Sequence, residues 1–342
     1  MADDRKEPAS TPRRLTRREL LGGAAGLAMA GAFGLPLACR RAAPPPERAA
    51  HPTVGPGESP LAGPSAGAGA EGAAPSPPAG ELPRATVVLV RHEQVLGPGR
   101  RIDAGVLAGM LEEGVTRLTA ALTPDEAWAR LFTPRDIVGI KSNHWRFLPT
   151  PPELEQAIRQ RLLALGIPEQ QLAVDDRGVR TNLLFARASA LINVRPARTH
   201  HWAGVGSCIK NYIMFADDPP GWHADACADL AGLWELPTVR GKTRLNILVM
   251  LTPLFHGKGP HHFDPRYTWE YKGLLLGTDP VAVDATGLRI LQAQRRLHFG
   301  SAEPLPVSPK HVAYAETRHR LGVADPARIE VVKLGWAEGA LI

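Results

Sequence analysis

The chain has 342 residues and a formal net charge of +6 at pH 7. Six basic and four acidic side chains fall in residues 1–38, and the rest of the chain has no basic stripe with interleaved aromatic residues. The charge pattern therefore argues against a nucleic-acid partner. The three cysteines, Cys39, Cys208 and Cys227, form no C-x-x-C pair, so neither an iron–sulfur cluster nor a zinc ribbon is expected on this chain.

The amino terminus has the features of a twin-arginine export signal. Thr16 precedes the pair Arg17-Arg18, and a weakly apolar stretch rich in Gly and Ala follows. About 17 residues of such mild composition make a poor permanent membrane span, whereas a signal peptide of this kind is removed after export. We therefore expect residues 1–38 to be a signal peptide, the twin-arginine translocase to be a partner during export, and the mature protein to be periplasmic.

The segment after the signal indicates a tether. Leu35-Pro36-Leu37-Ala38-Cys39 is similar to a lipoprotein box, although Pro36 stands where the usual pattern has Leu. Lipidation of Cys39 and ordinary signal cleavage both remain open, and a lipid anchor is the only membrane contact expected. Residues 39–83 are dominated by Pro, Ala and Gly, a composition that cannot bury a core and predicts disorder. Residues 84–342 are then left for one folded domain.

Short apolar runs alternate with helical patterns along this domain. The expected strands are short and continuously apolar, at residues 85–91, 136–140, 171–174, 190–194, 245–250, 274–276 and 329–332. The expected helices are at residues 104–122, 124 onward, 153–166, 206–215, 225–234, 279–295 and 309–320. This order predicts an α/β fold with a mainly parallel open sheet that helices cover on both faces.

Polar residues gather where the expected strands end. Lys141 and Asn143 follow the strand 136–140, Asp176 follows 171–174, and a run that includes His200 and Lys210 follows 190–194. In open α/β sheets ligands bind beyond the carboxyl ends of the strands. If all these strands are parallel, their ends form one edge, and the long side chains converge on a single cleft.

We assign roles to these residues by their chemistry. The candidate catalytic residues are Lys141, His200 and Lys210, since a lysine near a low-dielectric cleft can serve as a base or nucleophile. The candidate ligand-binding residues are Asn143, Asp176, Thr199, Asn211, Gly257, Gly259 and Asp279. For each group a structural alternative stays open: the lysines as solvent-seeking groups, Asn143 and Asn211 as helix caps, Asp279 before Pro280 as a helix N-cap.

Five histidines fall in two of the expected loops. Neutral imidazoles in this number suit zinc, nickel or copper, and His200, His256 and His261 are the candidate ligands. The alternative is a set of ordinary surface histidines. A metal ion is thus one candidate cofactor, and the sequence names no other.

The motifs at these positions resemble the domain of unknown function 362 family, many of whose members carry twin-arginine signals. The resemblance spans Ala85 to Arg295 and rests on DIVGIKSN, LINVRPARTHHWAGVGSCIKN, HGKGP and GTDPVAVDATG, in that order. It implies an α/β fold and a site at these motifs. Relatives often carry an acidic residue where this chain has Val249 and Met250, which argues against a carboxylate-dependent mechanism, and Arg198 replaces their usual Lys.

Three hypotheses fit the sequence. The favoured hypothesis is a periplasmic redox or isomerising enzyme that acts on a small anionic molecule at Lys141, His200 and Lys210. The alternative is a non-catalytic lipoprotein that binds a ligand or metal and presents it to a membrane partner. A structural periplasmic domain without a ligand is the third possibility.

Overall fold

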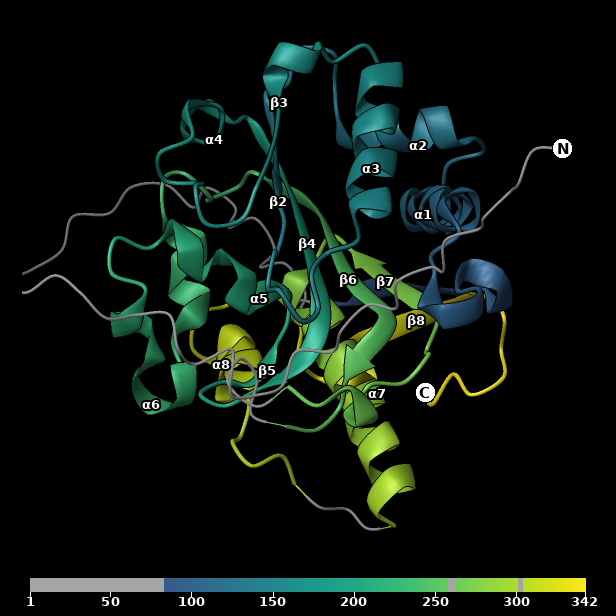
Figure 1. Ribbon diagram of the computed structural model, residues 1–342. Coiled ribbons are helices and arrows are strands. Elements are labelled where there is room, and N and C mark those ends of the chain that lie inside the picture. Colours follow the sequence, from purple (N-terminus) through teal and green to yellow (C-terminus); the bar gives the residue numbers. More distant parts are fainter. Residues whose placement is uncertain (1–82, 258–262, 301–303) are drawn as a thin grey trace, which may run out of the picture. The chain divides into compact units, whose positions relative to one another are not determined.

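The computed structural model describes residues 83–257, 263–300 and 304–342 (Figure 1). All described residues lie in one compact unit, Pro75–Ile342. The signal peptide, Cys39 and nearly all of the tether therefore lie outside the described residues. No helix within these three ranges is long and apolar enough to cross a membrane.

The folded unit is built on one eight-stranded sheet with the order β3-β2-β4-β6-β7-β1-β8 and a short β5 paired to β4. The strands are β1 (Ala85–Arg91), β2 (Val138–Lys141), β3 (Leu172–Asp175), β4 (Ala190–His200), β5 (Gly204–Gly206), β6 (Thr243–Leu254), β7 (Gly273–Gly277) and β8 (Ile329–Gly335). The helices are α1 (Ala104–Thr119), α2 (Pro124–Leu131), α3 (Pro152–Ala164), α4 (Leu183–Arg187), α5 (Cys208–Asn211), α6 (Ala224–Cys227), α7 (Pro280–Phe299) and α8 (Lys310–Thr317).

Helices cover both faces of the sheet, as predicted. On one face, alternate strand residues such as Ile140 and Val194 pack with the apolar sides of α1, α2 and α3. On the other face, Leu191 and Leu248 pack with residues of α4, α7, α8 and the short 3₁₀ segments. Since side chains alternate along a strand, the same alternation decides which polar residues face which helices. Figure 1 shows α1–α3 set apart from α5, α6 and α8 across the sheet.

One strand runs against the predicted direction. β7 pairs antiparallel with both β6 and β1, whereas β2, β3, β4 and β6 are mutually parallel neighbours and β1 is parallel to β8. The expectation that residues 274–276 end at the same sheet edge as the other strands is therefore wrong. The described parts of the β6–β7 connection contain only a 3₁₀ turn, Pro265–Tyr267, and a parallel pairing would need a crossover over the sheet.

The polypeptide after β4 is less regular than its pattern predicted. The expected helix 206–215 is the four-residue α5 followed by a 3₁₀ segment, Tyr212–Phe215. The expected helix 225–234 is the short α6 and a 3₁₀ segment, Leu230–Glu235. Three consecutive residues of this region, Asp225, Ala226 and Cys227, have positive φ angles of 45–64°, which interrupts a right-handed helix.

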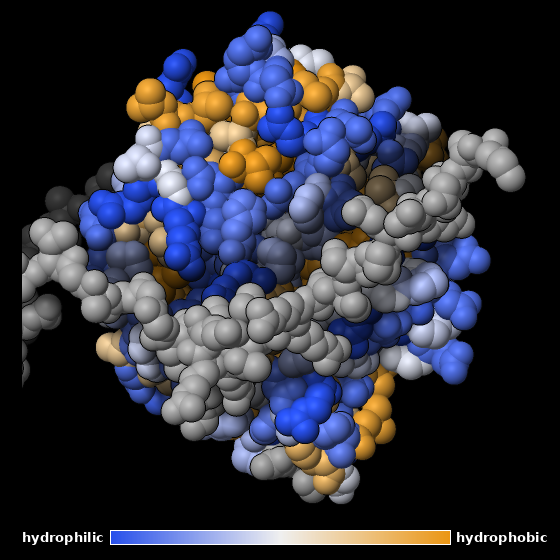
Figure 2. Space-filling model, viewed as in Figure 1, coloured by the Kyte–Doolittle hydropathy of each residue, from blue (hydrophilic) through white to orange (hydrophobic). Residues whose placement is uncertain are grey.

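The described surface on the face shown in Figure 2 is mainly hydrophilic. Its larger apolar area lies near α4, where Leu183 is 78% exposed.

Candidate functional site

A row of polar side chains crosses the buried middle of the sheet. Lys141 of β2 pairs in register with Asn193 of β4, which pairs with Asn246 of β6. All three are fully buried, and the alternation along each strand directs them to the face that carries α5 and α7. Buried polar groups must find partners within the protein, so this row imposes a hydrogen-bonded network on the residues above it.

Amide side chains form that network. Asn211, the last residue of α5, donates from Nδ2 to Asn193 Oδ1 at 2.9 Å. Asn193 donates in turn to Asn246 Oδ1 at 3.0 Å, and Asn246 donates to the carbonyl of Thr278 at 3.1 Å. The chain of amides fixes α5 over three strands, and a fully bonded buried network of this kind holds its members rigidly.

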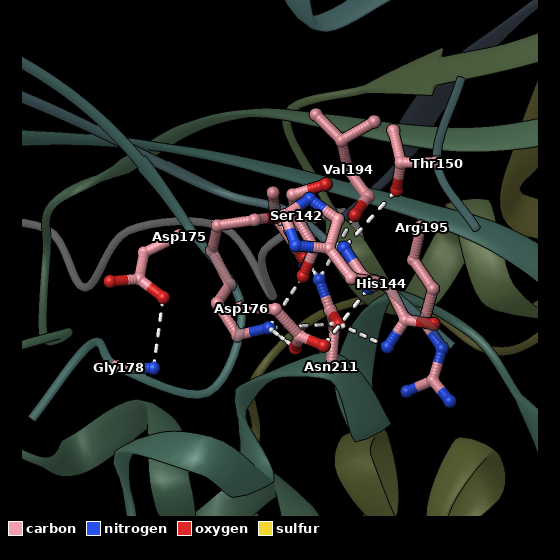
Figure 3. Close-up of polar contacts among 12 residues, drawn as sticks. Ser142, His144, Thr150, Asp175, Asp176, Gly178, Val194, Arg195 and Asn211 are labelled. Carbon is pink, nitrogen blue, oxygen red and sulfur yellow. Dashed lines mark hydrogen bonds and ion pairs between the residues drawn. The ribbon is translucent and has the colours of Figure 1, made fainter. Parts of the chain in front are cut away.

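Lys141 and Asp176 form a buried ion pair beside this network, at the joined ends of β2 and β3. The Lys141 Nζ lies 2.7 Å from Asp176 Oδ1 and 3.3 Å from Asn211 Oδ1. Asn143 donates to the same Asn211 oxygen at 3.4 Å. The structure thus joins four of the predicted site residues, Lys141, Asn143, Asp176 and Asn211, and Figure 3 shows Asp176 and Asn211 within one set of polar contacts.

Burial shifts the titration of both members of the pair. Desolvation lowers the pKa of Lys141 to about 8, although the Asp176 carboxylate opposes this shift. Burial raises the pKa of Asp176, but the Lys141 ammonium and the His144 backbone amide outweigh it and leave the pKa below its ordinary value. Asp176 is therefore ionised at neutral pH, and Lys141 keeps its proton more weakly than a lysine in water.

Asp284 of α7 holds α5 from the opposite side. Its carboxylate is fully buried and accepts hydrogen bonds from the Ser207 hydroxyl at 2.6 Å, the Cys208 amide at 2.7 Å and the Ile209 amide at 2.8 Å. These amides are the free donors at the start of α5, which a carboxylate satisfies. Asp284 thus sets the direction of the turn that carries Lys210 and Asn211.

Lys210 is 3% exposed and contacts no carboxylate in the described structure. Its Nζ lies 3.1 Å from His223 Nε2 and 3.7 Å from the Cys227 sulfur. His223 Nδ1 is 3.1 Å from the carbonyl of Pro220, so Nδ1 carries the proton and Nε2 accepts from Lys210. Desolvation lowers the pKa of Lys210 to about 8, and burial together with the Lys210 charge lowers the pKa of His223.

His200 lies close enough to Lys210 and Arg198 that burial and their charges move its pKa far below the ordinary value. Its Nδ1 accepts hydrogen bonds from the backbone amides of Trp202 at 3.2 Å and Ala203 at 3.3 Å. The neutral ring therefore carries its proton on Nε2. His200 is a neutral hydrogen-bond donor, and in this tautomer it has no lone pair free to bind a metal.

Two buried arginines complete the cationic side of the site. Arg195 and Arg198 on β4 are 3% and 5% exposed. Desolvation lowers the pKa of Arg195 to about 10 and lowers the pKa of Arg198, which the neighbouring Arg195 charge lowers further. Arg198 stacks on the Trp145 ring at 4.2 Å. Figure 3 shows the Arg195 guanidinium directed away from the Asp176 contacts.

A cleft of about 850 Å³ opens above the Lys141–Asp176 pair. It is lined by residues that follow β2 and β3: His144, Trp145, Arg146, Phe147, Asp175, Asp176, Arg177 and Gly178. Its wall includes Trp145, the ring on which Arg198 stacks. The cleft therefore borders Asp176 of the ion pair and the ring on which Arg198 stacks, and its own lining carries two arginines and two aspartates.

Some predicted residues lie elsewhere or serve the fold. Asp279 caps α7 by accepting from the amides of Val281 and Ala282, and it also accepts from Val323, which agrees with its structural alternative. Thr199 donates to the carbonyl of Gly257 at 3.0 Å. His256 lies 3.1 Å from Arg295 and packs on Tyr267, in a separate aromatic group. Gly259 and His261 lie outside the described residues.

Within the described ranges, no three His, Cys, Asp or Glu side chains are grouped so that they could hold a metal ion. The tautomer of His200 also disfavours it as a ligand. Since His261 is outside these ranges, the metal site stays a prediction. Cys208 and Cys227 are both buried and free.

Several functional residues were not predicted from the sequence. His223, Asp284 and His311 come from segments whose patterns indicated only helices or loops, and Asn193 and Asn246 lie inside strands. Asn193 and Asn246 did carry a signal, because an amide inside an otherwise apolar buried strand needs a partner.

Comparison with known proteins identifies the family of the central segment. No curated protein and no solved structure matches the chain. The model of the domain of unknown function DUF362 matches residues 169–289, which hold Asp176, His200, Lys210 and Asp284 but not Lys141. The chain is thus similar to the DUF362 family over residues 169–289, and the family resemblance is confirmed for that segment.

Proposed function

We propose that this protein is an exported enzyme that isomerises a small anionic molecule by moving a proton. One observation carries the proposal: four cationic side chains, Lys141, Arg195, Arg198 and Lys210, are buried, and two of them contact the wall of the cleft, Lys141 through Asp176 and Arg198 through Trp145. Isolated buried charges are unfavourable, so such a concentration is expected only where an anion binds.

The groups around Lys210 are suited to proton transfer. A lysine with a pKa near 8 has a substantial fraction of free amine close to neutral pH, which is the condition for a general base. His223 accepts a hydrogen bond from it and is partly exposed, so it offers a route for a proton to solvent. These features favour the isomerising form of the hypothesis, in which Lys210 removes a proton from the carbon next to an anionic group and the proton returns at another position.

The neighbouring residues have supporting roles in this proposal. His200 donates from Nε2 to an oxygen on which negative charge develops, as a neutral imidazole can when its pKa is low. Arg195 and Arg198 hold the anionic group. Lys141, fixed by Asp176 and Asn211, has a positioning role, since it holds the Asp176 carboxylate that lines the cleft. Export by the twin-arginine translocase and anchoring through Cys39 belong to the same proposal.

Hydrogen exchange at carbon tests the enzyme hypothesis without a known product. The full chain is incubated in D₂O with carboxylic acids of three to six carbons, and proton NMR follows the loss of the signal next to the carboxylate. We expect exchange with at least one acid, a loss of about 100-fold or more in Lys210→Met, and no change in the exposed control Lys333→Met. Exchange that persists in Lys210→Met would reject this role. Tight binding of an acid without exchange would favour the carrier alternative.

A further inference from the structure

We propose that the buried cationic cluster formed by Arg195, Arg198, Lys210 and His311 binds a small dianion, a dicarboxylate or a phosphate ester, rather than a monoanion. The inference deepens the proposed function and rests on it, because it names the charge of the molecule that the same site accepts. Three observations support it: the balance of buried charge, the unused donors of the arginines, and the position of His311.

With Lys210 protonated, the buried side chains of this site carry a net charge of +2. Besides the four buried cations, the described residues of this site include two buried carboxylates, Asp176 and Asp284. Asp176 pairs with Lys141, and Asp284 accepts from Ser207 and two backbone amides. Arg195, Arg198 and Lys210 therefore form no ion pair in the described ranges. A monoanion would leave one excess charge in the low-dielectric interior, whereas a dianion would leave none.

The arginines also present unused hydrogen-bond donors. Arg195 Nε and Arg198 Nε and Nη1 are buried and have no hydrogen-bond partner in the described structure. The Arg198 guanidinium has one face on Trp145, so that its edges remain for a ligand. Leaving such buried donors unpaired is unfavourable. Oxyanions match them, since arginine N–H groups form short charge-assisted bonds to carboxylate and phosphate oxygens.

His311 on α8 closes the cluster from the helical side. It is fully buried, and neither ring nitrogen has a hydrogen-bond partner among the described residues. Burial, together with the charges of Lys210 and Arg195, lowers the pKa of His311 to about 3, so its ring is neutral at pH 7.5. Gly204 of β5 lies against the carbonyl of Val307 and the backbone of Pro309, so the start of α8 at Pro309, two residues before His311, packs on β5. A neutral His311 can donate one N–H to the bound oxyanion.

Thermal unfolding of the full chain at pH 7.5 tests the inference with malonate, inorganic phosphate and acetate at matched ionic strength. A ligand that binds only the folded state raises the unfolding midpoint. We expect about 10 mM malonate or phosphate to raise it by roughly 3–8 °C, and acetate by less than about 1 °C. Arg198→Met should abolish the rise in the unfolding midpoint, and His311→Phe should weaken the affinity for the dianion about 10-fold. The exposed control Arg187→Met should show the same midpoint rise and the same dianion affinity as the wild type.

The outcomes separate this inference from the proposed function. Equal shifts with acetate and malonate, both lost in Arg198→Met, would overturn the dianion inference and leave the anion site intact. No shift with any anion would overturn both. Arg198→Met without ligand should unfold at the same temperature as the wild type or higher, because an uncompensated buried charge is removed. A lower midpoint with the malonate shift retained would make Arg198 structural and overturn the inference.

Discussion

Lys141 and Lys210 are two buried lysines with different surroundings. Lys141 has a carboxylate partner at 2.7 Å, so its charge is compensated inside the protein. Lys210 has a neutral imidazole and a thiol instead, and the nearest charges that act on it, Arg195 and Arg198, repel it. A site that binds an anion needs the second kind of lysine, because a lysine already paired to a carboxylate has less attraction left for a ligand.

The uncompensated charge of Lys210 predicts an unusual pH dependence of stability. Its pKa is about 8 in the folded protein and about 10.4 when unfolded. Between these pH values the unfolded state binds more protons, so the free energy of unfolding rises as the pH rises from 8 to about 10.4. Below pH 8 the buried lysine is charged in the folded protein and destabilises it fully. Lys210→Met should therefore be more stable than the wild type at pH 7 by roughly 1–3 kcal/mol.

Urea unfolding at pH 7 and at pH 10 measures this difference. We expect the advantage of Lys210→Met to shrink at pH 10, where the wild-type lysine is neutral, and the exposed control Lys333→Met to show no such change. A Lys210→Met variant that is less stable than the wild type at pH 7 would mean that the lysine supports the fold.

Single residues of the site were predictable where they follow strands, and unpredictable where they come from distant turns. Lys141 and Asp176 could be named because ligands bind at the ends of parallel strands. His223 could not, since its contact with Lys210 depends on the left-handed run Asp225–Cys227 and on no sequence periodicity. Asp284 lies five residues after the α7 cap, where the sequence indicated a helix and gave no sign that this position faces α5.

At the scale of elements, apolar runs located the strands well but not their directions. All seven expected strands are present, and β4 and β6 extend further, to His200 and Leu254. The direction of β7 depends on the connection before it. The sequence of this connection has no helical pattern, and the lack of a crossover helix could have predicted that β7 is antiparallel to β6. The lengths of the helices α5 and α6 were overestimated, because local helix propensity does not include tertiary contacts such as the Asp284 cap.

The close packing of β5 against the segment before α8 gives a prediction at this scale. Gly204 has a φ of +71°, and a Cβ there would overlap the carbonyl oxygen of Val307. Gly241 has nearly the same φ, +68°, but no atom within 4 Å of the added Cβ. Gly241→Ala should lose about 1 kcal/mol from the backbone conformation alone, whereas Gly204→Ala should lose about 3 kcal/mol or more from conformation and contact together.

Urea denaturation of the two alanine variants compares them directly. Both variants lose stability because alanine is strained at a positive φ. The difference between their losses in free energy of unfolding therefore measures the contact between β5 and residues 307–309. Equal losses would show that this contact does not hold His311 in place.

At the scale of the whole chain, the folded unit and the amino-terminal region differ in their content of apolar and aromatic residues. Residues 84–342 supply enough apolar residues for the three buried clusters described above. Residues 39–83 contain no aromatic side chain, so their composition favours a spacer over a second core. A spacer has a clear use if Cys39 is lipidated, since it separates the folded unit from the membrane surface.

Lipidation of Cys39 is therefore a prediction for the chain as a whole. Cells that express the full chain are grown with labelled palmitate, and the protein is isolated. We expect the label in the wild type and none in Cys39→Ala, because this cysteine alone follows the lipoprotein-like sequence. Cys208→Ala is the matched control and should keep the label. An unlabelled wild type would indicate ordinary signal cleavage.

The export route is the second prediction at this scale, and it bears on how the site is formed. The twin-arginine route carries folded cargo, so a buried network such as Asn211–Asn193–Asn246 would be complete before export. Replacing Arg17 and Arg18 together by Lys keeps the positive charge of the signal and removes only the arginine pair. We expect this variant to remain in the cytoplasm, folded, while replacing Arg13 and Arg14 by Lys leaves the periplasmic fraction unchanged. Arrival of the wild type in the periplasm of cells that lack the twin-arginine translocase would contradict the assignment, since another route would then carry it.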